Sequence, residues 1–187
     1  MLLPLFHHAQ LLDSTELAKT FSFTSIEEAL KQPDKVIRLE LRKMKLKEFP
    51  LEIFQFKNLQ YLDISKNSIR YIPDSLYLLP DLQFFIGAKN KIEQLPLTIG
   101  KLTRLKTLNF NNNELISLPY QIGNLSELQY LDLWSNNLTY FPESLSKLTQ
   151  LRVMDLRSIM INANQQERLH HLLPNAEIEM DRPCNCN

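Results

Sequence analysis

The sequence predicts a solenoid, a domain in which one supersecondary unit stacks on copies of itself. The first observation is a column of asparagines spaced by 23 residues, and the second is a column of prolines with the same spacing. The asparagines are Asn67, Asn90, Asn113 and Asn136, and the prolines are Pro50, Pro73, Pro96, Pro119 and Pro142. Apolar residues open and close each unit in the same register. A fixed period in this range is typical of stacked repeats that bury one continuous core.

The composition fits one domain and argues against several function classes. The chain has 187 residues, and its 44% of hydrophobic residues suffices for a buried core. Lysine plus arginine balances aspartate plus glutamate at 21 each, so no net field favours nucleic acid or an anionic membrane. The only two cysteines, Cys184 and Cys186, argue against a disulfide scaffold and are compatible with a reducing compartment.

The apolar N-terminus, residues 1–12, raises the question of a signal peptide. It lacks a basic stretch, and no small-residue cleavage site follows its leucines. No segment of the chain is apolar over the roughly 18 residues that a membrane helix needs. We therefore expect a soluble, cytoplasmic protein.

Residues 1–35 precede the repeats, and we expect them to form an N-terminal helical cap. Asp13 with Glu16, and Ser25 with Glu28, have the spacing of capping boxes that begin short helices. The second helix should span roughly residues 26–31 and end before a proline. Because an open end of a solenoid exposes its core, apolar residues of this segment should cover it. They are Leu11, Leu12, Leu17, Phe21, Phe23, Ile26 and Leu30.

Residues 36–150 comprise five repeats, which start at Val36, Leu59, Leu82, Leu105 and Leu128. Each begins with the alternation of apolar and polar residues that predicts a short strand. One strand per unit, always returning in the same direction, predicts parallel pairing between neighbouring units. In the fifth repeat Leu131 and Leu133 should point into the core. Tyr130, Asp132 and Trp134 should point outward.

Residues 151–180 should form a sixth, altered repeat followed by a C-terminal cap, and residues 181–187 a tail. A helix is expected over residues 163–173 and a short strand over residues 176–180. Because chain termini are usually disordered unless they are tied down, we expect the cysteine-containing tail to be frayed.

Three positions depart from the repeat pattern. Met44 in the first unit and Ile159 in the last take the place of the asparagine, where a neighbouring unit is missing. Gly87 replaces an inward leucine and should leave a hole in the core. We expect Phe85 of the same strand and Phe110 of the next repeat to fill it.

The pattern LxxLxLxxNxLxxLPxxIxxL resembles the leucine-rich repeat family, in the 23-residue subclass of Ras-suppressor-like and many bacterial proteins. The resemblance extends from about residue 26 to residue 180. It implies an α/β fold, a curved right-handed solenoid (horseshoe) with a parallel sheet on its concave face and helical caps. It also implies a protein-binding module, without shared catalytic residues, that commonly holds its ligand on the concave sheet.

No sequence motif for nucleotide, metal or nucleophile chemistry occurs, so we expect no enzymatic activity, no cofactor and no metal. The adjacent histidine pairs, at positions 7–8 and 170–171, point in different directions on a helix and lack the spacing of metal ligands. An acidic column on the outward strand face contains Glu40, Asp63, Asp132 and Asp155. Acid–base catalysis requires a pocket that tunes the pKa values of such carboxylates, and we expect an open sheet to offer none.

Outward-facing aromatic residues are the candidate binding site. Tyr61, Phe84 and Ile86 should cluster on adjacent strands, and Tyr130 should form a second cluster with Trp134. Asp132 of the same strand belongs to this candidate binding site. A polar strand with Thr107, Asn109 and Asn111 should separate the two. Aromatic residues also suit strands without any function. The only tryptophan at a solvent-facing position nevertheless favours an interaction site.

We therefore expect a monomeric, non-enzymatic module that binds a protein or peptide on its concave sheet and binds neither nucleic acid nor a membrane. The four repeated asparagines should form a structural ladder. Three alternatives remain open. The chain could be a secreted or surface recognition or adhesion protein, the sensing subunit of a separate enzyme, or a self-associating structural protein. The C-terminal cap argues against the enzyme subunit.

Overall fold

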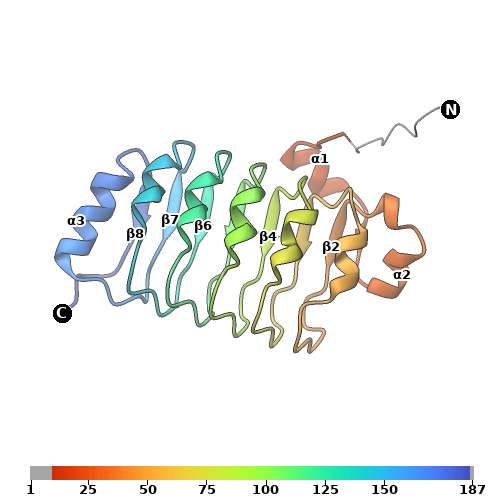
Figure 1. The fold of residues 1–187 in the computed structure, drawn as a ribbon, viewed down its shortest axis with the longest axis horizontal. Coiled ribbons are helices and arrows are strands. Elements are labelled where there is room, and N and C mark those ends of the chain that lie inside the picture. Colours follow the sequence, from red (N-terminus) through yellow and green to blue (C-terminus); the bar gives the residue numbers. More distant parts are fainter. Residues whose placement is uncertain (1–9, 186–187) are drawn as a thin grey trace.

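The fold is a single open sheet of eight parallel strands, flanked along its length by short helices (Figure 1). The computed structural model describes residues 10–185. The strands are paired in chain order and are β1 (Ser22–Phe23), β2 (Arg38–Glu40), β3 (Tyr61–Asp63), β4 (Phe84–Ile86), β5 (Thr107–Asn109), β6 (Tyr130–Asp132), β7 (Val153–Asp155) and β8 (Glu177–Glu179). The predicted solenoid with a parallel sheet is confirmed.

Strand register follows the 23-residue period. Tyr61 is paired with Phe84, Phe84 with Thr107, and Thr107 with Tyr130. Because side chains alternate along a strand, the middle residue of each strand points into the core and the residues on either side of it point outward. The buried middle residues of β2 to β7 are Leu39, Leu62, Phe85, Leu108, Leu131 and Met154. We call the surface formed by the outward residues the sheet face.

The chain returns on the opposite side through 3₁₀ helices, each of which follows a proline of the repeated column. They are η2 (Leu51–Gln55), η3 (Asp74–Leu78), η4 (Leu97–Lys101), η5 (Tyr120–Asn124) and η6 (Glu143–Lys147). The proline carbonyl accepts the first hydrogen bond of the helix, as from the Ile99 N–H to Pro96 at 3.0 Å. The third residue of each helix is buried, so this short turn is enough to close the core.

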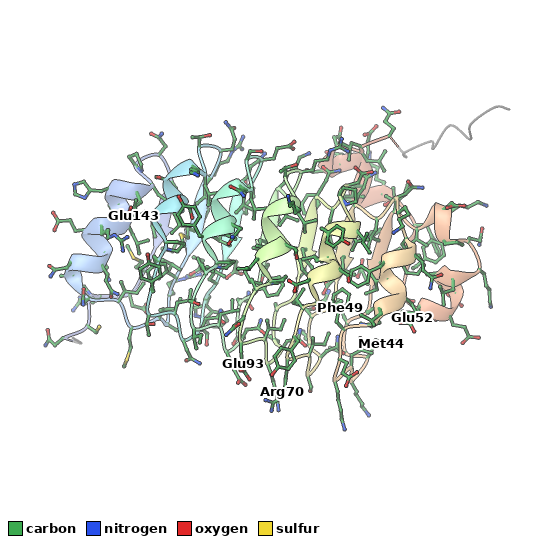
Figure 2. The ribbon with its side chains drawn as sticks, in the orientation of Figure 1. Met44, Phe49, Glu52, Arg70, Glu93 and Glu143 are labelled. Atoms are coloured by element: carbon green, nitrogen blue, oxygen red, sulfur yellow. The ribbon has the colours of Figure 1, made fainter. Side chains whose placement is uncertain are left out.

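The repeated asparagines tie each repeat to its neighbour. The Asn113 side-chain amide donates to the carbonyls of Gly87 in the preceding repeat and of Phe110 in its own, both at 3.0 Å. Its Oδ1 accepts from the Ile92 N–H at 3.0 Å. The same set of bonds occurs at Asn67, Asn90 and Asn136. In the first repeat Met44 takes this position and is 48% exposed at the turn (Figure 2).

The residue before each ladder position has a left-handed backbone, with φ between 53° and 59°. These residues are Lys43, Lys66, Lys89, Asn112, Ser135 and Ser158. Their positive φ is uncommon for residues other than glycine. The backbone N–H groups here bond the next repeat, as from Lys66 to the Ala88 carbonyl at 2.9 Å. Hydrogen bonding between repeats therefore holds a conformation that the residue types do not indicate.

Phe110 lies directly against Gly87, as predicted from the sequence. A Cβ atom built at Gly87 would lie 2.7 Å from the ring of Phe110, which is closer than real Cβ contacts. The rings of Phe85 and Phe110 meet edge to face with centroids 5.0 Å apart, and both are fully buried. The phenylalanine thus occupies the volume that a leucine takes in other repeats.

The N-terminal cap contains α1 (Ser14–Lys19), β1, α2 (Ile26–Leu30) and η1 (Pro33–Lys35). Asp13 and Glu16 form the capping box of α1, and the Ser25 hydroxyl accepts from the Glu28 N–H at the start of α2. Leu17 and Phe23 are buried. The expectation that Leu11, Phe21 and Leu30 cover the core is wrong, because these side chains are exposed, that of Phe21 to 73%. The rings of Phe21 and Phe23 meet at right angles with centroids 5.0 Å apart.

The described segment before α1 does not lie over the end of the solenoid. It lies along the amino-terminal ends of the strands β3 and β4 (Figure 1). Two buried glutamines that precede β3 and β4 hold it. Gln60 accepts from the Leu12 N–H at 2.9 Å and donates to the Gln10 carbonyl at 3.1 Å. Gln83 donates to the Leu12 carbonyl at 2.9 Å. The cap therefore fastens two repeats at their edge as well as covering the first one.

At the other end α3 (Ala163–Leu172) and β8 follow the last repeat. Asn162 begins α3 through a capping box with Gln165. Glu143 of η6 lies beside this helix and forms an ion pair with Arg168 at 3.6 Å (Figure 2). The expectation of a frayed tail fails at Cys184, whose N–H donates to the Ile161 carbonyl at 3.1 Å and which is disulfide-bonded. Cys186 lies outside the described residues.

Residues 10–185 contain neither a membrane-spanning helix nor a cluster of metal-ligating side chains. No helix in this range has the length and apolar character to cross a bilayer. No group of three or more metal-ligating side chains gathers there. His170 and His171 are exposed on α3, and the ring of His171 lies 2.8 Å from the Glu167 carbonyl. The histidines at positions 7 and 8 lie outside the described residues.

Candidate functional site

Three columns of side chains cross the sheet face, one residue per strand. The first column contains Arg38, Tyr61, Phe84, Thr107, Tyr130, Val153 and Glu177. The second contains Glu40, Asp63, Ile86, Asn109, Asp132, Asp155 and Glu179. Two residues further on, a third column contains Arg42, Ser65, Ala88, Asn111, Trp134 and Arg157. Each strand therefore presents up to three neighbouring outward positions.

The first strands neutralise their charges within the chain. The Arg38 guanidinium lies over the Tyr61 ring, 4.0 Å from its centroid, and forms an ion pair with Glu40 at 2.7 Å. Arg42 lies 3.4 Å from the carboxylate of Asp63, whose side chain is almost fully buried. Burial, and then the Asp63 charge, raise the pKa of Tyr61 above its ordinary value, against the opposing effect of Arg38.

The predicted aromatic cluster of the first half is present. The rings of Tyr61 and Phe84 have centroids 5.8 Å apart, and Ile86 follows on the same strand as Phe84. All three side chains are partly exposed. They form an apolar patch whose rim is already occupied by Arg38 and by the paired Asp63.

The second half presents Tyr130, Asp132 and Trp134 along β6 and its continuation. Tyr130 is 44% exposed and Trp134 is 37% exposed. Trp134 donates through Nε1 to the Ser158 hydroxyl of the next repeat at 3.1 Å. This bond orients the indole along the sheet. The two aromatic side chains therefore lie on either side of Asp132, with β5 separating them from the first cluster.

Asp132 is a carboxylate without an ion-pair partner among residues 10–185. Its Oδ2 accepts from the Asn111 amide at 2.6 Å and its Oδ1 from the Trp134 N–H at 3.2 Å. Burial raises its pKa above the ordinary value, against these two hydrogen bonds, and repulsion from Asp155 adds to the rise. The pKa is raised although the sheet is open, because the neighbouring side chains exclude water from part of this carboxylate.

Asp155 on the next strand shows the opposite behaviour. Burial acts to raise its pKa, but hydrogen bonds from Arg157 and the charge of Arg157 lower it below the ordinary value. The same guanidinium reaches Glu179 of β8 at 3.0 Å. Arg157 is therefore committed to the last two strands and leaves Asp132 unpaired.

The second column also has a structural role that sequence reasoning missed. Its side-chain oxygens accept from the backbone N–H two residues further on, at Asp63, Asn109, Asp132 and Asp155. Such bonds to the residue two positions ahead are a common property of aspartate and asparagine in turns. Aspartate or asparagine stands at the strand end in four repeats, and isoleucine takes the place at position 86. This recurrence is the signal that could have revealed the role.

The comparisons with known proteins identify the repeat. Residues 79–177 match the family model described as a leucine-rich repeat region, and residues 58–79 match that of a single leucine-rich repeat. The chain belongs to the leucine-rich repeat family. The sheet face is accordingly the concave side of the solenoid. Proteins of this family commonly mediate protein–protein interactions and are generally not enzymes. No curated protein sequence matches the chain significantly.

Solved structures extend the likeness. A leucine-rich repeat protein of Leptospira interrogans is 27% identical with a TM-score of 0.72, over 88% of this chain and 49% of that one. The plant peptide hormone receptor RGFR1 in complex with RGF2 is 25% identical with a TM-score of 0.60, and the match covers 75% of this chain and 23% of that one. The complex PEPR1-AtPEP1 is 25% identical with a TM-score of 0.56, and the match covers 60% of this chain and 16% of that one. This chain thus spans about half or less of each of these proteins.

Proposed function

We propose that this protein is a non-enzymatic module that binds a protein or peptide partner on its concave sheet face. The observation that carries the proposal is the pair of exposed aromatic side chains, Tyr130 and Trp134, on a face held rigid by the asparagine ladder. Exposed aromatic residues are enriched at protein interfaces, where they contribute large contact areas. Because the surface is preformed, little conformational entropy is lost on binding.

The two aromatic groups suit a ligand laid across the strands. Neighbouring strands are about 4.8 Å apart, so Phe84 and Tyr130, on either side of Thr107, lie roughly 10 Å apart. A short polar side chain between two apolar anchors leaves a shallow saddle. We expect an extended peptide or a helix to cross β4, β5 and β6 there, in a monomeric, cytoplasmic protein that needs no cofactor.

The experiment is capture of partners by the purified protein from extracts of its native cell. We expect Trp134→Ala, and separately Phe84→Ala with Ile86→Ser, to remove the same captured protein. Leu97→Ser on η4 is the control, because Leu97 is 62% exposed on the opposite side. Loss of the captured protein with Leu97→Ser, but with neither sheet-face variant, would refute the proposal.

A surface recognition protein is the second candidate. The observation that favours it is the likeness to the plant peptide hormone receptor RGFR1, whose structure is a complex with RGF2. Both candidates use the sheet face, and they differ in the compartment in which the partner is met. Fractionation of the native cell, followed by detection of the chain with an antibody, distinguishes them.

A further inference from the structure

The strands β3 and β6 have the same three residues, tyrosine, leucine and aspartate, at positions 61–63 and 130–132. They lie three repeats apart, in the same register of the same sheet. Tyrosine occupies the first column and aspartate the second in both strands. Any difference between the two sites therefore arises from the residues around them.

At β3 the preceding repeat supplies two arginines. Arg38 covers the ring of Tyr61 at 4.0 Å, and Arg42 lies 3.4 Å from the Asp63 carboxylate. A guanidinium suits both contacts, since its plane stacks on an aromatic face and its N–H groups match a carboxylate. The chain itself thus shows which chemical group this tripeptide accepts.

At β6 the corresponding positions of the preceding repeat are neutral. Thr107 takes the place of Arg38, and Asn111 takes the place of Arg42, each 69 residues further along. Tyr130 is 44% exposed as a result, and Asp132 accepts hydrogen bonds only from the uncharged Asn111 amide and the Trp134 N–H. The tripeptide is present, but its cationic partner is not supplied by residues 10–185.

The neighbours of Asp132 do not take this role. Thr107, Asn109 and Asn111 on the β5 side are uncharged. On the β7 side Asp155 is a second carboxylate, and Arg157 is held by Asp155 and Glu179 at 2.6 and 3.0 Å. The charge of Arg157 also acts to lower the pKa of Asp132, but its direct ion pairs are those with Asp155 and Glu179, so within residues 10–185 the Asp132 carboxylate is open to a cation from outside.

We propose that Tyr130, Asp132 and Trp134 form a receptor for an arginine side chain of the bound protein or peptide. One guanidinium makes the two contacts that Arg38 and Arg42 divide between them at β3: it lies against the tyrosine ring and donates to the Asp132 carboxylate. Trp134 provides a second aromatic surface two positions beyond Asp132. The inference rests on the proposed function, and it adds the charge and the side chain by which the partner is recognised.

The test uses a library of short random peptides displayed on phage and selected on the purified protein. Selected peptides are then synthesised and titrated against the fluorescence of Trp134, the only tryptophan of the chain. We expect enrichment of arginine in the selected peptides. Replacing that arginine by glutamine should weaken binding at least about tenfold, as for charge-assisted contacts at interfaces.

Two variants test the site itself. Asp132→Asn removes the charge but keeps the turn, as Asn109 shows on the neighbouring strand, and it should weaken the arginine peptides at least about tenfold. Thr107→Arg supplies the internal cation of β3 and should block the same peptides, whereas the uncharged Thr107→Gln should bind them more tightly than Thr107→Arg does. If the affinity of the arginine peptides is the same for the wild type and all of these variants, the proposed arginine site is refuted.

The outcomes separate the two proposals. If the selected peptides lack arginine enrichment but lose binding with Phe84→Ala plus Ile86→Ser, the proposed function stands and the arginine receptor is refuted. If binding survives every sheet-face variant and is lost with Leu97→Ser, both proposals are refuted. Arginine-rich peptides that lose binding with Asp132→Asn and keep it with Leu97→Ser support both.

Discussion

The strands β3 and β6 present the same tripeptide to the same face of one sheet, yet one site is closed and the other is open. At β3, arginines of the preceding repeat cover Tyr61 and pair with Asp63. At β6, threonine and asparagine occupy those positions, and Asp132 has no ion-pair partner within the described residues. In a solenoid each repeat contacts mainly its neighbours. The contacts of an outward residue therefore depend on the neighbouring repeats, and at these two strands the preceding repeat makes the difference.

The core, unlike the sheet face, is packed in the same way at both strands. The largest predicted change in stability is therefore expected for a substitution in the core. Phe110→Ala should lower the free energy of unfolding by about 3–5 kcal/mol, because it empties a fully buried aromatic position. Thermal and denaturant unfolding measure this change. Phe21→Ala is the matched control, since that ring is 73% exposed, and it should change stability by less than about 0.5 kcal/mol.

Gly87→Leu tests the same packing from the other side. A Cβ at this position meets the Phe110 ring at 2.7 Å, so the larger residue should cost about 1–3 kcal/mol through overpacking. Combining it with Phe110→Leu should recover part of the loss. A Gly87→Leu protein that is more stable than the wild type would show that the site is an unfilled hole.

Substitutions of the ladder asparagines should give the next largest loss of stability, and the loss should be similar in both halves of the solenoid. Asn113→Ala should cost about 1–3 kcal/mol for each buried backbone group that it leaves unsatisfied. Asn67→Ala, in the first half, should give a similar loss through the same bonds. Asn137→Ala, at an exposed position next to the ladder, is the control. Unchanged melting temperatures in the ladder variants contradict a structural role.

The two aspartates of the shared tripeptide should respond differently to the same substitution. Asp63→Asn removes the charge that pairs with Arg42 and should cost about 1 kcal/mol, a modest value because Arg42 is half exposed. Asp132→Asn removes a carboxylate that has no cationic partner and should leave stability at neutral pH unchanged or slightly higher. Equal losses at the two positions contradict the comparison.

The dependence on pH sharpens this point. The folded-state pKa of Asp132 is raised, so its stabilising contribution is fully present below the unfolded-state pKa and is lost as the pH rises through the folded-state pKa. Asp132→Asn should therefore match the wild type in acid and gain on it towards neutral pH. Urea unfolding across this range measures the difference. A wild type that gains on the variant as the pH rises contradicts a raised pKa.

Much of the fold follows from periodicity in the sequence. The inward leucines, the parallel pairing and the contact of Phe110 with Gly87 were all predictable, because each depends on one repeat and its immediate neighbour. The contact at the amino-terminal ends of β3 and β4 was not predictable. Gln60 and Gln83 occupy positions that look solvent-facing in the repeat, and they are buried only because the Gln10–Leu12 segment docks on them. Such a contact between distant segments leaves no periodic signal.

The candidate site was predictable in its members but not in its electrostatics. Outward alternation alone placed Tyr130, Asp132 and Trp134 together on one strand. The unpaired state of Asp132 depends on what stands 21 and 25 residues earlier, at Asn111 and Thr107. Aligning the repeats in register would have shown this difference. The left-handed backbone at the lysines of three successive repeats, Lys43, Lys66 and Lys89, was not predictable from residue type.

The most direct test of the central claim is a calorimetric titration of the captured partner into wild type and Trp134→Ala, with thermal unfolding of both measured in parallel. We expect binding to weaken by at least about 2 kcal/mol, because an exposed aromatic anchor is lost. The unfolding temperature should stay the same, since Trp134 is 37% exposed and outside the core. Unchanged affinity, or an affinity loss that merely accompanies a lower unfolding temperature, would contradict binding on the sheet face.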